Sequence, residues 1–86
     1  METNPAFYGL SPRIVLEVIK PNLIGIRKVI KSRIIRKDAL KIVEIARQIK
    51  SVTPQVEVTL ICTRNICSKS IQLLKSNGIV VAFTEL

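Results

Sequence analysis

Six basic residues stand within eleven positions of this chain, and no acidic residue interrupts them. Aliphatic residues are threaded through the run, so it is unlike a flexible basic tail. Positive charge mounted on folded elements is typical of surfaces that contact the phosphate backbone of nucleic acids. The sequence therefore predicts a phosphate-binding surface made of Arg27, Lys28, Lys31, Arg33, Arg36 and Lys37.

The charge balance of the whole chain favours the same kind of partner. Fourteen Lys and Arg residues against six Asp and Glu residues give a net charge of +8. We expect nucleic acid, duplex DNA before RNA, and no membrane, because no apolar run approaches the roughly 18 residues that span a bilayer. Residues 1–12 lack the organisation of a signal peptide, which predicts a cytoplasmic protein. Abundant Ile, Lys and Arg without His are typical of hyperthermophiles.

The two cysteines, Cys62 and Cys67, lack the spacing of a CxxC redox or zinc pair, and the chain has no histidine to complete a metal site. We expect one cysteine packed in a strand and the other near the start of a helix, with no metal and no cofactor. A disulfide between them stays open, because hyperthermophile proteins are an exception to the reducing cytosol.

The C-terminal half predicts a strand, a helix and a second strand. Residues 56–63 place an apolar side chain at every second position, so they predict a strand with one strongly apolar face, while the other positions hold Glu57, Thr59, Ile61 and Thr63. Residues 68–77 predict a helix with Ser68 as its N-cap, and residues 79–83 form a short apolar run typical of a strand covered on both faces. The two strands should be parallel, with a right-handed crossover.

A long helix is expected upstream, from Ser32 or Arg33 to Lys50. Before it, residues 13–20 and 23–31 are rich in Ile and Val and joined by Pro21-Asn22, which favours a β-hairpin. Helices starting at Ser11-Pro12 and at Asn22 are the alternative. The chain is thus expected to form one α/β domain over residues 12–86, preceded by an arm, residues 1–11, that can be mobile.

This order of elements, ββαβαβ, resembles the core of the restriction-endonuclease-like (PD-(D/E)XK) nucleases. Many archaeal members have a strand ending in Glu-x-Lys-Ser, then basic residues, then a helix opening Lys-Asp-(Ala/Val)-Leu. Residues 29–40 of this chain are Val-Ile-Lys-Ser-Arg-Ile-Ile-Arg-Lys-Asp-Ala-Leu, and the later elements resemble the family's closing strand, helix and strand. The resemblance covers residues 13–83 and implies a three-layer core in which helices pack on a mixed sheet.

The departures from that pattern concern the metal site. In the family, an acid on an earlier strand and the Glu of Glu-x-Lys hold Mg²⁺, while the Lys supports the developing charge. Lys31 matches the lysine, but Val29 stands at the position of the Glu, and Glu17 is the nearest candidate for the earlier acid. The resemblance therefore implies a nuclease-like fold with an incomplete metal site.

The register of the hairpin decides where Glu17 lies. A two-residue turn at Pro21-Asn22 pairs Glu17 with Ile26 and places it on the face opposite Lys31. A shift of one residue would bring Glu17 to the side of Arg27 and Lys31. The simplest hairpin thus separates the strand acid from the candidate catalytic lysine.

Three functions follow from these observations. The favoured one is a non-catalytic DNA-binding protein that contacts phosphates with little base readout. The second is a non-catalytic interaction subunit or a homodimer, for which an open sheet edge would supply an interface. The third is an active Mg²⁺-dependent nuclease, formed either through an unexpected hairpin register or through acids lent by another subunit. Arg64 and Asn65 follow a strand at a position where α/β sheets often bind ligands, although loop polarity alone explains them.

Overall fold

The computed structural model describes the whole chain, residues 1–86, and contains a mixed sheet and two α-helices. Neither helix is long and apolar enough to cross a membrane. The predicted order of strands and helices is confirmed, with a short 3-10 helix added near the N-terminus. The elements are η1 (Pro5–Tyr8), β1 (Val15–Lys20), β2 (Leu23–Lys28), α1 (Arg36–Val52), β3 (Glu57–Cys62), α2 (Ser68–Ser76) and β4 (Val80–Phe83).

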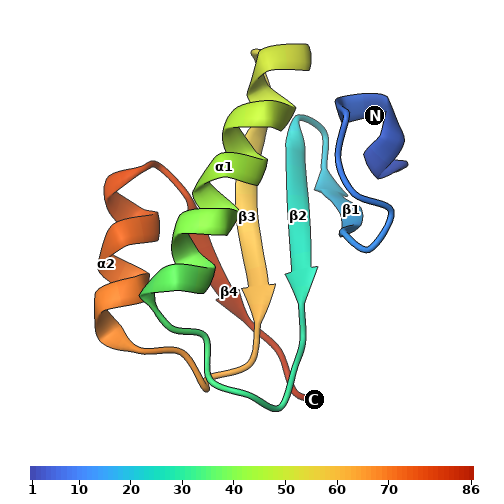
Figure 1. Cartoon of the computed structure of the whole chain (residues 1–86). Coiled ribbons are helices and arrows are strands. Elements are labelled where there is room, and N and C mark those ends of the chain that lie inside the picture. Colours follow the sequence, from blue (N-terminus) through green and yellow to red (C-terminus); the bar gives the residue numbers. More distant parts are fainter.

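The sheet has the strand order β1-β2-β3-β4. β1 and β2 are antiparallel, whereas β2, β3 and β4 are mutually parallel, as the α/β class requires. Each parallel connection passes through one helix and steps to the next strand in the same direction. Right-handed crossovers of this kind place both helices on the same face of the sheet. α1 and α2 accordingly lie side by side and pack on each other (Figure 1).

The predicted three-layer core is therefore wrong, because the structure has two layers. The core lies between the helices and one face of the sheet, and it includes Ile24, Ile26, Val58 and Leu60. The opposite face has no helix over it, and we call it the open face. The prediction that β4 is covered on both faces is wrong for the same reason, since Val80 is 66% exposed.

The predicted hairpin is confirmed, but its simplest register is wrong, and the register shifted by one residue is the one observed. Asn22 takes a left-handed conformation (φ 64°), which asparagine tolerates in tight turns. An irregularity between Val18 and Lys20 shifts the pairing, so Glu17 lies opposite Gly25 instead of Ile26. The side chain of Ile19 crosses the open face at this point, and its Cδ1 would lie 3.0 Å from a Cβ added at Gly25. Gly25 has no side chain, so it leaves room for the bulge opposite it.

α1 begins at Arg36, three residues or more after the predicted start at Ser32 or Arg33. Ile34 is withdrawn from the helix because it forms a parallel bridge with Ile66. The carboxylate of Asp38 accepts a hydrogen bond from the Ile35 N–H at 3.0 Å, which satisfies a donor at the new helix start. Pairing between two loops thus competes successfully with helix formation in this segment.

The 3-10 helix η1 of the N-terminal segment packs on α1. Tyr8 is 1% exposed and belongs to the core, and its hydroxyl donates to the Glu2 carbonyl at 2.6 Å. The side-chain amide of Gln48 donates to the Tyr8 carbonyl at 2.8 Å. The single tyrosine of the chain therefore anchors its N-terminal segment to the helix layer.

Candidate nucleic-acid interface

One end of the molecule gathers the carboxyl ends of β2 and β3 and the amino ends of both helices, because the strands are parallel and the helices return between them. We call this the basic end and define it as residues 28–37 and 63–69. It contains no acidic residue, and Asp38 lies just outside it on α1. Its basic residues are Lys28, Lys31, Arg33, Arg36, Lys37, Arg64 and Lys69.

The two loops of the basic end are hydrogen-bonded to each other. The Ile34 N–H donates to the Asn65 carbonyl at 2.9 Å, and the Cys67 N–H donates to the Ile34 carbonyl at 3.0 Å. The side-chain amide of Asn65 donates to the Lys31 carbonyl at 3.0 Å. Ile34 and Ile66 are buried beneath these contacts. The cations of the two loops are thus mounted on a hydrogen-bonded platform.

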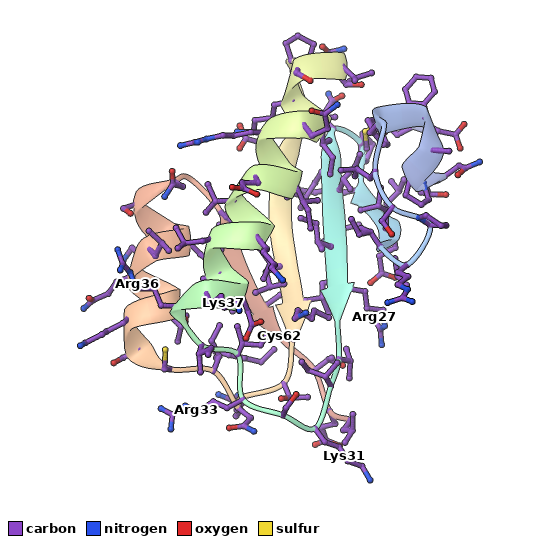
Figure 2. All side chains as sticks on the ribbon, in the orientation of Figure 1. Arg27, Lys31, Arg33, Arg36, Lys37 and Cys62 are labelled. Atoms are coloured by element: carbon purple, nitrogen blue, oxygen red, sulfur yellow. The ribbon has the colours of Figure 1, made fainter.

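Five of the six predicted phosphate-contacting residues lie at this end. Lys31, Arg33, Arg36 and Lys37 are exposed, and Lys28 is half-buried as the last residue of β2. Figure 2 shows Lys31 and Arg33 projecting from the loop and Arg36 projecting from the first turn of α1. They fan outward from the molecule, so they form a broad surface rather than a closed site.

Arg27 is the predicted residue that the structure separates from the others. Its side chain lies on the open face of the sheet, together with Glu17, and its Nη1 is 3.2 Å from the Glu17 Oε1. The bulge in β1 brings this acid to the same face as Arg27. Both side chains are nearly half exposed, so solvent screens the pair and it contributes little to stability.

Arg64 and Lys69 join the basic end although the charge run in the sequence does not include them. Arg64 is identified from the sequence as a residue that follows the end of a strand. The same topological signal, that the ends of neighbouring parallel strands meet at one edge of a sheet, could have found Lys69. The Arg27–Glu17 contact is the one salt bridge in the structure. Every cation of the basic end is therefore without a carboxylate at ion-pair distance.

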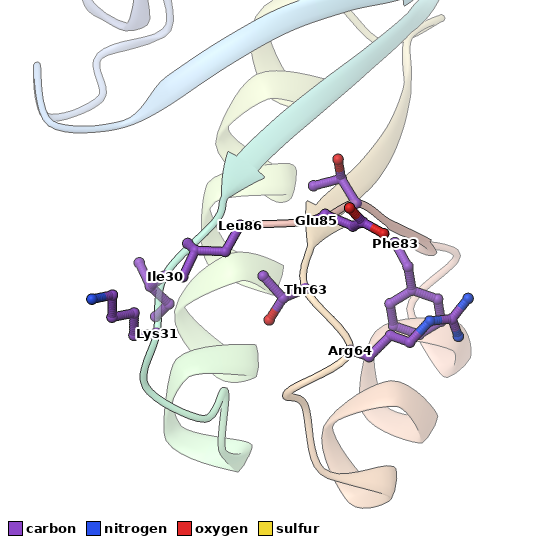
Figure 3. Close-up of a pocket in the computed structure, with 8 residues that line it drawn as sticks. Ile30, Lys31, Thr63, Arg64, Phe83, Glu85 and Leu86 are labelled. Carbon is purple, nitrogen blue, oxygen red and sulfur yellow. The ribbon is translucent and has the colours of Figure 1, made fainter.

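A cavity of about 550 Å³ opens beside the basic end, between the loops and the C-terminal residues. Lys31 and Arg64 both line it, but Figure 3 shows them on opposite sides, with Lys31 directed away from Arg64. The guanidinium of Arg64 instead lies over the ring of Phe83, 4.8 Å from its centroid. The two cations do not converge on one point, so the cavity is not built to enclose a small anion.

Both cysteines are free thiols, and the expectation of one in a strand and one at a helix start is confirmed. Cys62 is buried in β3, and burial raises the pKa of its thiol. Cys67 is the N-cap of α2, and its Sγ lies 2.9 Å from the Ser70 Oγ. The hydrogen bond with Ser70 lowers the pKa of the Cys67 thiol, and the nearby charge of Arg33 acts in the same direction.

Cys67 is expected to react with iodoacetamide faster than Cys62 at neutral pH. The thiolate is the nucleophile, so a lowered pKa raises the reactive fraction of Cys67, while burial and a raised pKa protect Cys62. Mass spectrometry of the alkylated chain over a pH series gives both rates. In Ser70→Ala the reaction of Cys67 should need a higher pH, and an equal rate at both cysteines would contradict this prediction.

The acids of the chain are not gathered into a metal site in the structure, where no group of three or more His, Cys, Asp or Glu side chains is placed to hold an ion. Glu17, the candidate ligand, is engaged by Arg27 on the open face, whereas Lys31 lies in the loop beyond β2.

No protein-family model, curated protein or solved structure matches this chain.

Proposed function

We propose that this chain binds nucleic acid, duplex DNA before RNA, through contacts between the basic end and backbone phosphates. The observation that supports the proposal is a set of cations without carboxylate partners, carried on two loops that are hydrogen-bonded to each other. Phosphate contacts require charge at the right position and no enclosed pocket. An outward-facing basic surface meets that requirement.

The amino ends of the two helices support the same proposal. The N–H groups of a first helical turn are unpaired, and the helix dipole favours an anion there. Arg36 and Lys37 are the first two residues of α1, and Lys69 lies in the first turn of α2. Cations at these positions interact unfavourably with the helix dipole, and a bound phosphate would offset the free-energy cost of that interaction.

Little base readout is expected from this surface. The aromatic residues are few, and the one ring near the basic end, that of Phe83, is stacked by Arg64. We propose a nuclease-like protein that holds DNA without cutting it, since Val29 replaces the family's Glu and Glu17 pairs with Arg27. An active Mg²⁺-dependent nuclease is the alternative, and it would need acids from another subunit.

Anisotropy of a fluorescently labelled duplex, titrated with the protein at several salt concentrations, tests the proposal. About five phosphate contacts predict that log K falls with log salt at a slope of about −4 to −5. Two duplexes of unrelated sequence should bind equally well. Absence of binding at low salt would refute the proposal, and cleavage of the duplex on adding Mg²⁺ would support the nuclease alternative.

A further inference from the structure

The two edges of the sheet differ in how they are protected. The β1 edge is interrupted by the bulge between Val18 and Lys20 and ends at Lys20-Pro21. A bulge, a lysine and a proline are devices that discourage an incoming strand. β4, at the other edge, contains no charged residue, no proline and no irregularity of pairing. The β4 edge is therefore open to strand addition.

The backbone of β4 offers hydrogen-bonding groups at this edge. The Thr84 N–H donates to the Cys62 carbonyl at 2.8 Å. This bond shows which residues of β4 direct their backbone groups toward β3 and which direct them outward. Val80 and Ala82 then direct their N–H and C=O groups toward β3, and Val81 and Phe83 direct theirs outward. No strand lies beyond β4 in the sheet, so these outward groups have no ladder partner.

An apolar groove of about 350 Å³ runs beside the same edge, between β4 and α2. Ile71, Ile79 and Val81 are among its lining residues, and Lys75 is its one charged residue. Val80 is 66% exposed and Phe83 is 42% exposed. Unpaired backbone groups and exposed apolar side chains thus occur together here.

We propose that a second copy of this chain adds its β4 to this edge in antiparallel orientation. A two-fold axis perpendicular to the sheet would join the two four-stranded sheets into one, with all helices on the same side. Phe83 of each copy would then pack toward the groove of the other. Main-chain hydrogen bonds and the apolar contact together would hold the pair.

Charge complementarity at the β4 edge favours a second copy as the occupant. Each chain carries a net charge of +8, so most faces of two copies repel each other, but β4 is uncharged. Antiparallel pairing also places Glu85, just after β4, beside the start of β4 of the other copy, where Lys75 lines the groove. Two such opposite-charge contacts are made by symmetry. The basic ends of the two copies would point in opposite directions, which keeps their charges apart.

Sedimentation equilibrium over a range of protein concentrations tests this inference, with a matched pair of variants. Val80→Lys introduces charge into the proposed interface and is expected to raise the dimer dissociation constant at least about tenfold, which corresponds to roughly 1.4 kcal/mol. Val15→Lys introduces the same charge at the other edge, where Val15 is 53% exposed, and should leave the constant unchanged.

Phe83→Pro provides a second variant, which removes both a backbone donor and the ring that packs in the proposed interface. Proline removes the outward N–H of residue 83 and no bond to β3, so the fold should survive while the dimer dissociates. Circular dichroism checks the fold of each variant. A wild-type chain that stays monomeric at every concentration, or a Val15→Lys variant that dissociates as readily as Val80→Lys, would overturn the inference. This test does not involve nucleic acid, so it is independent of the proposed function.

Discussion

Replacing Arg33 and Arg36 together with glutamate is expected to weaken binding to a DNA duplex by roughly sixtyfold or more in 0.1 M salt. Each phosphate contact contributes about 0.9 to the slope of log K against log salt, which is worth about eightfold at this concentration. Both residues are exposed and without a carboxylate partner. Their loss removes two contacts, and the new carboxylates repel the phosphates in addition.

The loss of DNA binding should not come from a loss of stability. Arg36 is the first residue of α1, where a glutamate complements the helix dipole and stabilises the helix by a few tenths of a kcal/mol or more. The melting temperature of the double variant should therefore equal or exceed that of the wild type. The slope of log K against log salt should become shallower by about 2.

A matched control separates the position of the charge from its amount. Lys20 and Arg47 are exposed, and they lie away from the basic end, at the end of β1 and in the second half of α1. Lys20→Glu together with Arg47→Glu changes the net charge equally and should weaken binding much less. Equal losses in the two double variants would show that net charge alone attracts the DNA and would remove the basic end from the proposal.

The order of elements could be predicted because each one has its own local signal. The alternation of residues 56–63, the stripe of α1 and the Pro21-Asn22 turn depend on periodicity and turn chemistry within single elements. The structure keeps the strand, the helix and the turn, but β3 has more than the one buried face that the pattern predicts, because Thr59 and Ile61 on its other face are buried as well. Branched aliphatic residues favoured the hairpin over the helical alternative for residues 13–31, and this choice is confirmed.

The errors concern contacts between elements. The bulge at Ile19 depends on how its side chain crosses Gly25 toward Ile61, and no local pattern indicates such a crossing. The late start of α1 depends on the bridge between Ile34 and Ile66, which are far apart in the sequence. Handedness and strand order together place both helices on one face, and the resemblance to nucleases supplied a third layer that the chain does not build.

Only part of the candidate interface could be predicted, because the rest depends on contacts between elements. A run of charge identifies residues that are neighbours in the sequence, and Lys31, Arg33, Arg36 and Lys37 do lie at one end of the molecule. It cannot show that the pleat of β2 sends Arg27 to the open face. Nor can it show which residues arrive from another loop, and Arg64 and Lys69 arrive in that way.

The two-layer architecture predicts that substitutions on the two faces of the sheet lower the free energy of unfolding by very different amounts. Leu60 is fully buried on the helix-covered face of β3, so Leu60→Ala should lower the free energy of unfolding by about 3 to 5 kcal/mol and Tm by more than about 12 °C. Val15, on the open face of β1, is 53% exposed, and Val15→Thr should cost less than about 0.5 kcal/mol. Denaturant and thermal unfolding measure both. A comparable cost at Val15 would mean that another part of the protein covers the open face in solution, because only a buried methyl group loses that much when it is replaced.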